Sequence, residues 1–224
     1  MNLPFYVPPE QLMKDRAEYA RKGIARGKSI AAVEYADGML LLAENPSRTL
    51  HKIGEIYDRI AFAGVGKYSE FETLRVAGIR HADLKGYSYA RSDVTAKSLA
   101  NAYSHALGQI FTQEVKPYEV GIMLVEVGDT SESTLLFKIT YDGTLTTEDD
   151  VAAIGGQEEQ LTAHLRQSFR PGAPLAEAVQ WGVAAFEAAS SRKFQPNEWE
   201  AAVIDRTLGR RAFRRLSAAE MGGA

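Results

Sequence analysis

The chain has 224 residues, a net charge of −3 at pH 7 and no cysteine. This length is enough for one domain that buries roughly 70% of its unfolded surface. The absence of cysteine excludes disulfides, Cys–zinc sites and thiol catalysis, and fits a reducing compartment. The charge gives no general attraction to nucleic acid or anionic lipid. No apolar run approaches the roughly 20 residues of a membrane helix, and the N-terminus lacks the basic region of a signal peptide. We therefore expect a cytoplasmic globular protein with no nucleic-acid and no membrane partner.

The chain is expected to begin with an extended segment and an amphipathic helix. Prolines at positions 4, 8 and 9 fix φ and remove backbone donors, so residues 1–8 are expected to be irregular. Pro9 suits the first turn of a helix. Met13, Ala17, Ala20 and Ile24 then recur at helical spacing, and the basic end of the segment complements the helix dipole. The pattern predicts a helix over residues 9–27.

Four strands and two helices are expected next. The strand-like runs are residues 29–35, 39–44, 50–57 and 60–65, with Asp37-Gly38 as the turn of the first hairpin. The first two runs are apolar at nearly every position, so both of their faces should be covered. One helix is expected at about residues 67–85, and a second from an N-cap at Asp93 to a stop before Pro117. Their inward faces are predicted to carry Phe71, Leu74, Gly78 and Ala82, and Leu99, Ala102, Ala106 and Ile110.

The second half again has strands in runs, followed by a helix pair. A hairpin over residues 120–127 and 135–140, a turn at Tyr141-Asp142-Gly143, and a strand over 151–154 precede helices at 158–169 and 174–190. Strands at 199–205 and 211–216 come last. Strands grouped in this way favour the α+β class. We expect two stacked, mostly antiparallel sheets, each covered by a helix pair.

The residues offer little catalytic chemistry. The four histidines lack metal-ligand spacing, and there is no Gly-x-Ser-x-Gly elbow. The run Gly23–Ser29 has one residue too few between its glycines for a phosphate loop and leads into a strand. Gly64-Val65-Gly66-Lys67 lies between a strand and a helix, where amides could hold an anion, although a plain tight turn is the alternative. The basic cluster Arg210, Arg211, Arg214 and Arg215 is more simply a solvated sheet face or an oligomer contact.

Several motifs, taken in order, resemble the proteasome α-subunits of actinobacteria. They are Glu18-Tyr19-Ala20-Arg21, Ala36-Asp37-Gly38, Ala43-Glu44-Asn45-Pro46-Ser47-Arg48, His51-Lys52-Ile53, Lys116-Pro117-Tyr118-Glu119-Val120, Tyr141-Asp142-Gly143-Thr144, Ala153-Ile154-Gly155-Gly156 and Ala202-Val203-Ile204-Asp205. The resemblance implies the four-layer αββα sandwich of the N-terminal nucleophile hydrolases. It also implies a ring with six further copies of the chain, stacked on a ring of proteasome β-subunits, and no cofactor.

The resemblance further implies that no residue of this chain is catalytic. The sister β-subunits begin at the first strand and use the freed threonine as the nucleophile, whereas Gly27, Lys28 and Ser29 stand at that place here. Lys52 and Glu44 fall near the catalytic lysine and acid of the β-subunits. We therefore expect a non-catalytic subunit of a threonine-type endopeptidase complex. The alternative is a catalytic N-terminal nucleophile hydrolase, a threonine peptidase of the β type or a relative, processed before Ser29.

A gate and a docking pocket are implied as well. Residues 1–9 would gate the entry of unfolded protein substrates, residues 10–218 would form one domain, and residues 219–224 a flexible tail. The C-terminal tails of a hexameric ATPase activator would bind at Lys52, Gly66, Lys67 and Glu18, because an ammonium and helix-start amides suit a peptide carboxylate. The gate residues are Met1, Asn2, Leu3, Pro4, Phe5, Tyr6, Val7, Pro8 and Pro9.

Overall fold

The computed structural model describes residues 8–47 and 49–222. The predicted gate residues 1–7 lie outside the described residues. Six helices are present in the described part: α1 (Pro9–Arg26), α2 (Tyr68–Ser88), α3 (Ala96–Gln113), α4 (Glu158–Ser168), α5 (Leu175–Ser190) and α6 (Ala218–Gly222). Ten strands are present in the same part, grouped in runs: β1 (Ile30–Tyr35), β2 (Gly38–Glu44), β3 (Ile53–Tyr57), β4 (Ile60–Gly66), β5 (Val120–Glu126), β6 (Leu135–Ile139), β7 (Leu145–Glu148), β8 (Val151–Ile154), β9 (Trp199–Asp205) and β10 (Phe213–Arg215).

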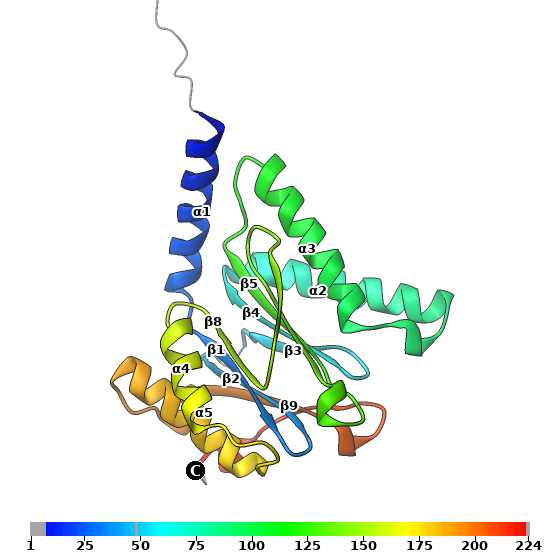
Figure 1. The fold of residues 1–224 in the computed structure, drawn as a ribbon, viewed down its shortest axis with the longest axis vertical. Coiled ribbons are helices and arrows are strands. Elements are labelled where there is room, and N and C mark those ends of the chain that lie inside the picture. Colours follow the sequence, from blue (N-terminus) through cyan, green and yellow to red (C-terminus); the bar gives the residue numbers. More distant parts are fainter. Residues whose placement is uncertain (1–7, 48, 223–224) are drawn as a thin grey trace, which may run out of the picture.

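The strands form two five-stranded sheets. The first has the order β10-β9-β2-β1-β8 and the second the order β3-β4-β5-β6-β7, and every neighbouring pair is antiparallel. One apolar cluster lies between the sheets, a second lies under α2 and α3, and a third under α4 and α5. Figure 1 shows the resulting order of helix pair, sheet, sheet and helix pair. The predicted four-layer αββα sandwich of the α+β class is confirmed.

The burial of β1 and β2 explains why these strands could be predicted from the sequence. Every residue of β1 and β2 is buried, because one face of their sheet meets the other sheet and the opposite face meets helices. Two boundaries and one turn differ from the predictions. Tyr35 pairs with Gly38, so the hairpin turn is Ala36-Asp37 rather than Asp37-Gly38. Strand β3 begins at Ile53 instead of residue 50, and β10 covers only Phe213–Arg215.

The predicted start of α3 was wrong, and its predicted inward face was right at Leu99 but not at Ala102. Thr95 is the N-cap, with its hydroxyl accepting the Ser98 amide, while Asp93 ends a short 3-10 turn and accepts the Ala90 amide. The buried residues are Ala96, Leu99, Ala100, Tyr103 and Leu107, whereas Ala102 is exposed. Tyr103 decides the rotation of the helix, because its hydroxyl donates to the Leu74 carbonyl at 2.9 Å across Gly78.

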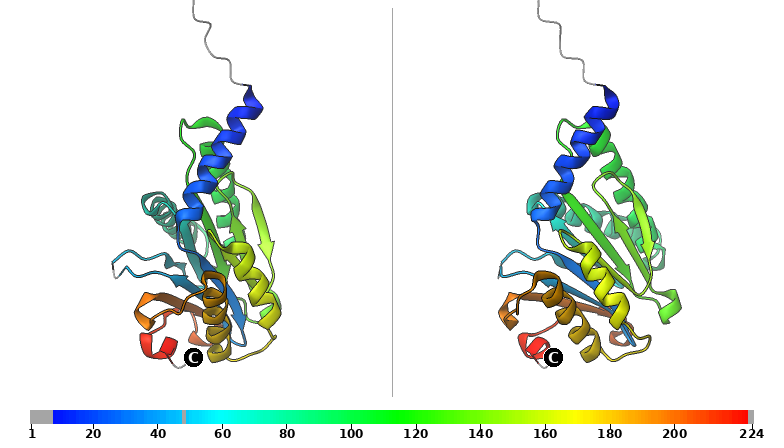
Figure 2. Two further views of the ribbon diagram at one scale, coloured as in Figure 1. Left: turned by 90° about the vertical axis from the view of Figure 1, so that its left-hand side faces the viewer. Right: turned by 60° about the vertical axis from the view of Figure 1, so that its left-hand side comes forward.

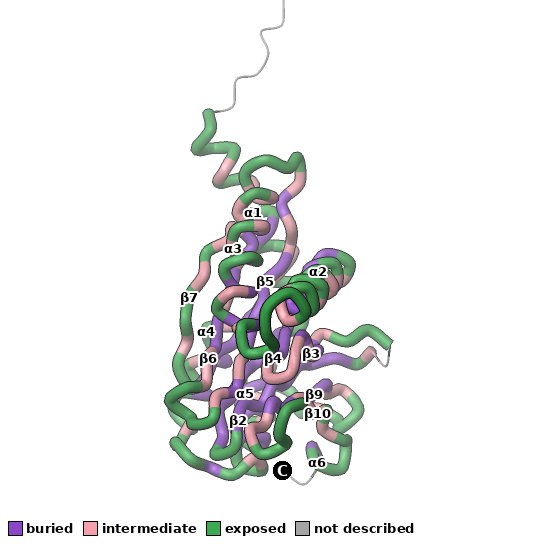
Figure 3. The backbone as a smooth tube through the Cα atoms, turned by 90° about the vertical axis from the view of Figure 1, so that its right-hand side faces the viewer, coloured by how far each residue is buried: buried purple, intermediate pink, exposed green. Residues whose placement is uncertain are grey.

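Helix α1 stands apart from the four layers. It rises from one end of the sandwich and contacts β4 and β5 (Figure 2). Ala20 is its only fully buried residue in the described part, and Leu12 and Tyr19 are 42% and 48% exposed. Figure 3 shows that most of the helix is exposed or only partly buried. The apolar side chains of Leu12 and Tyr19 on α1 are therefore only partly covered by the other described residues.

The C-terminal residues differ from the expected tail. Residues Ala218–Gly222 form helix α6, and Met221 is buried in the cluster under α4 and α5. Throughout the described residues, no helix combines the length and the apolar character needed to cross a membrane.

Candidate functional site

Lys52 lies immediately before β3, and its ammonium is partly enclosed by the protein. The Nζ atom donates to the Lys28 carbonyl at 2.7 Å and to the Glu44 carbonyl at 3.2 Å. Burial lowers the pKa of Lys52 from 10.5 to about 8, although the carboxylates of Glu200 and Glu44 oppose this effect. The side chain is therefore still mainly cationic at pH 7.

The backbone of Lys52 is fixed by a buried carboxylate on β9. Glu200 accepts hydrogen bonds from the amides of Lys52 at 2.9 Å and Ile53 at 3.1 Å. The same carboxylate accepts from the Asn45 amide group at 2.6 Å and from the Arg215 guanidinium at 2.9 Å. Sequence reasoning missed Glu200. The signal that could have found it is an acidic residue, second in β9, next to the apolar run Ala201–Ile204.

A second buried carboxylate, that of Glu44, lies beside the start of β1. Its Oε1 is 2.9 Å from the Lys28 ammonium and 2.7 Å from the Arg192 guanidinium. These three residues, with Arg26 and Gly27, line a polar pocket of about 350 Å³. The predicted neighbours Lys52, Glu44 and Lys28 therefore do come together, where a nucleophile at the head of β1 would stand.

Ser29 is the hydroxyl residue at the head of β1, and it is poorly suited to catalysis. It is 4% exposed, and its Oγ accepts the Gln157 amide at 3.2 Å. The chain runs back from Ser29 through Gly27 into α1, so Ser29 has no free α-amino group that could act as a base. The geometry resembles a nucleophile site from which the nucleophile is missing.

Gly66 lies close to the Lys52 site but is itself tightly enclosed. A Cβ atom on Gly27 would lie 2.9 Å from the Gly66 nitrogen, so the segment that accepts the Lys52 ammonium also covers Gly66. Gly66 has φ +104°, and a Cβ atom there would lie 1.8 Å from the Glu119 carbonyl oxygen. Only glycine fits this conformation and this close approach.

Lys67 and Glu18 have partners of their own. The Lys67 amide, which was expected to be free for an anion, donates to the Glu119 carbonyl at 2.9 Å. The Lys67 ammonium lies 3.6 Å from the Glu70 carboxylate. Glu18 pairs with Lys22, one turn along α1, at 2.7 Å. Within the part of the chain that the structure describes, no hydrogen bond or ion pair joins Glu18 to Lys52, Gly66 or Lys67.

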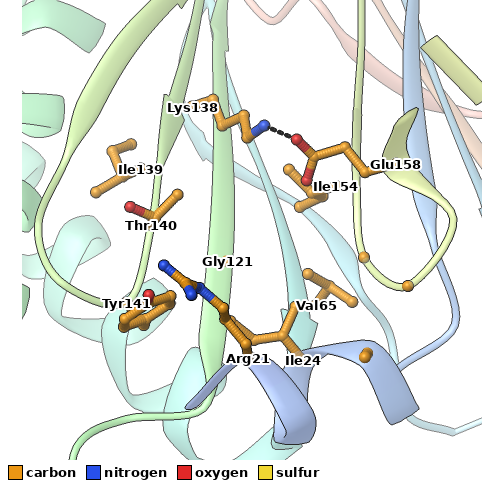
Figure 4. Close-up of a pocket in the computed structure, with 13 residues that line it drawn as sticks. Arg21, Ile24, Val65, Gly121, Lys138, Ile139, Thr140, Tyr141, Ile154 and Glu158 are labelled. Atoms are coloured by element: carbon orange, nitrogen blue, oxygen red, sulfur yellow. Dashed lines mark hydrogen bonds and ion pairs between the residues drawn. The ribbon is translucent and has the colours of Figure 1, made fainter. Parts of the chain in front are cut away.

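An apolar pocket of about 330 Å³ opens beside the C-terminal half of α1. Figure 4 shows Arg21 and Ile24 of α1 at one end and the ion pair of Lys138 with Glu158 at the other. Val65 and Ile154 line it between the two sheets. It carries no arrangement of catalytic groups. In residues 8–47 and 49–222, no cluster of three or more His, Asp or Glu side chains could hold a metal ion.

Comparisons with known proteins agree with this geometry. A family model described as "Proteasome subunit" matches residues 24–204. The chain is 54% identical to a protein named proteasome subunit alpha from Kineococcus radiotolerans, over 100% of this chain and 98% of the relative. It is 54% identical to the protein of that name from Acidothermus cellulolyticus, over 99% and 97% of the two chains, and 53% identical to that from Geodermatophilus obscurus, over 99% and 80%. The chain therefore belongs to the proteasome subunit family, and within it to the α-subunits.

Proposed function

We propose that this chain is the non-catalytic α-subunit of a proteasome core particle and forms the heptameric outer ring on which a ring of β-subunits assembles. The observation that carries the absence of catalysis is the continuous path from α1 through Gly27 into β1. A nucleophile of this fold needs a free N-terminus at the first strand. Here that point is internal, and the buried Ser29 hydroxyl is engaged by the Gln157 amide.

The ring has a candidate interface in α1. The helix packs on β4 and β5 along one side and leaves Leu12 and Tyr19 partly exposed. Apolar side chains on an element that projects from the sandwich favour packing against a neighbouring subunit. Residues 1–9 precede or begin this helix, and in the ring they would meet around the axis. There they would gate the entry of unfolded protein substrates.

The Lys52 site is the proposed dock for the C-terminal tails of a hexameric ATPase activator. Among the described residues, its ammonium donates to two backbone carbonyls, at 2.7 and 3.2 Å, and a peptide carboxylate would be a stronger partner. Gly66 lies beside it, and Lys67 would add a second positive charge within reach of a tail that crosses Gly66. Glu18, on the exposed side of α1, would contact residues of the activator further from its terminus.

Co-expression of the chain with a proteasome β-subunit tests the proposal. Electron microscopy should show a four-ring cylinder with sevenfold end views. Mass spectrometry should find this chain unprocessed, apart from loss of Met1, and the purified chain alone should hydrolyse no peptide. A mature form that begins at Ser29, with activity lost in Ser29→Ala, would establish the catalytic alternative instead.

A further inference from the structure

The apolar pocket beside α1 exists because several of the residues that line it are small. Three of them are the glycines Gly121, Gly155 and Gly156, and a fourth is Ala25, so none of these positions fills the space with a long side chain. Gly155 has φ +115°, and a Cβ atom on Gly156 would lie 2.6 Å from the Ala25 carbonyl oxygen. The close approach of α1 to the Gly155–Gly156 turn therefore requires glycine there and leaves the pocket open beside it.

The walls of this pocket suit a compact apolar group. Val65, Ile139 and Ile154 contribute side chains from β4, β6 and β8, and Ile24 contributes one from α1. The volume of about 330 Å³ lies at the lower end of the range of about 300–1,000 Å³ that is usual for small-molecule sites. A ligand of this size would be much smaller than a peptide.

The charged groups at the two ends of the pocket differ in their partners (Figure 4). At one end the Lys138 ammonium and the Glu158 carboxylate form an ion pair with no net charge. At the other end the Arg21 guanidinium lies 5.9 Å from the centre of the Tyr141 ring. Among residues 8–47 and 49–222, no carboxylate oxygen lies within 4 Å of this guanidinium. The Arg21 end therefore has a positive charge that the described carboxylates do not neutralise by direct contact.

The Tyr141 hydroxyl adds a hydrogen-bond donor at the same end. Burial raises the pKa of Tyr141, although Arg21 opposes this effect. The hydroxyl is therefore protonated at neutral pH and is able to donate to an anion. A guanidinium and a phenol next to apolar walls form a site with one anionic end and one apolar end.

We propose that this pocket binds a small carboxylate with an apolar body. The carboxylate would accept hydrogen bonds from the Arg21 guanidinium, which can donate two in parallel, and from the Tyr141 hydroxyl. The apolar body would lie between Ile24, Val65 and Ile154 and displace water from their surfaces. The charges also set the selectivity, because Arg21 repels an amine and the apolar walls disfavour a second carboxylate.

A ligand in this position would join α1 to both sheets. Arg21 and Ile24 belong to α1, whereas Val65 lies on β4 of one sheet and Ile154 on β8 of the other. In the described part of α1, Ala20 alone is fully buried, so the helix has few attachments of its own. The ligand should therefore slow hydrogen exchange in the second half of α1.

The test uses 3-phenylpropionate as the probe and its uncharged methyl ester as the control ligand. Arg21→Gln removes the charge, and Arg21→Lys restores a charge without the paired donors. Ala25→Trp fills the pocket from an exposed position on α1. Arg80→Gln, at an exposed arginine on α2, is the matched control. Binding is measured by NMR titration of the full chain and of the core particle assembled with the β-subunit, and thermal unfolding checks that each variant is folded.

Wild type and Arg80→Gln should bind one probe per chain, with slower hydrogen exchange in α1, and should bind the ester at least tenfold more weakly. Arg21→Gln should weaken binding of the probe at least tenfold, Arg21→Lys should weaken it less, and Ala25→Trp should abolish it. Wild-type affinity in either Arg21→Gln or Ala25→Trp would overturn the proposal, as would a wild-type chain that binds no probe at about 10 mM. Binding to the chain that is lost in the particle would also overturn it, since a neighbouring subunit would then fill the pocket.

Discussion

Replacement of Lys52 by methionine separates a docking role from a structural role. Methionine has a similar length and fills the same space, but it removes the charge and both hydrogen bonds of the ammonium. A residue that serves the fold should destabilise the protein when it is lost. A residue that is held partly desolvated for a ligand should not.

The structure gives the expected size of the effect. A lowering of the Lys52 pKa from 10.5 to about 8 means that the folded state disfavours the ammonium by roughly 3 kcal/mol relative to the neutral amine. The bonds to the Lys28 and Glu44 carbonyls contribute about 1 kcal/mol each and are lost in the variant. Lys52→Met should therefore raise the free energy of unfolding at pH 7 by about 1 kcal/mol.

The pH dependence provides a sharper test. Between pH 8 and 10.5 the unfolded state keeps a proton on Lys52 that the folded state has lost, so the stability of the wild type rises with pH across this window. The variant lacks this contribution, so its advantage should shrink by roughly 3 kcal/mol and reverse in sign by pH 10.5. Urea unfolding of the full chain, followed by tryptophan fluorescence, measures the difference at each pH. A variant that is less stable than wild type at pH 7, by a margin that does not change with pH, would refute this reasoning.

Three further outcomes are expected. Lys52→Ala should abolish activator pull-down while the assembled core still cuts small peptides, because about 1.5–3 kcal/mol is lost per tail and several tails bind one ring; normal pull-down would contradict the pocket assignment. Deletion of residues 1–8 should raise peptide hydrolysis by the core at a constant number of active sites, and equal rates would mean that the segment is no gate. Glu200→Ala should lower the free energy of unfolding by about 2–4 kcal/mol, because it leaves the buried Ile53 amide and the partly buried Lys52 amide without their acceptor; a loss below 1 kcal/mol in urea unfolding would show that water replaces the carboxylate.

The parts of the fold that could be predicted from sequence are those governed by local patterns. The apolar runs of β1, β2 and β9 are visible because both faces of each strand are covered. Helix α1 was predictable from Pro9 and the spacing of its partly buried side chains. The rotation of α3 was not, because it depends on where Tyr103 meets Gly78 on another helix. The predicted stripe had helical spacing, but only Leu99 of it is fully buried, and Ala102 is exposed.

The residues of the candidate site could likewise be predicted only where a local motif marks them. Motifs pointed to Lys52 and Gly66, which the structure places on either side of the Gly27–Lys28 backbone. Glu200 and Glu119 were missed because their roles depend on contacts far apart in sequence. Glu200 bonds the Lys52 amide across 148 residues, and Glu119 bonds Glu70 across 49. The Lys67 amide was assigned to a ligand because nothing in the local sequence shows that the Glu119 carbonyl already accepts it.

The arrangement around Lys52 shows how a catalytic framework can be present without catalysis. A lysine and a buried carboxylate meet at the head of the first strand, as an N-terminal nucleophile requires, but the lysine is held by the carbonyls of Lys28 and Glu44. The Glu44 carboxylate is neutralised by Lys28 and Arg192 instead of serving a nucleophile. Under the proposed function, the ammonium placed there assists no reaction and binds an anion that arrives from outside the subunit.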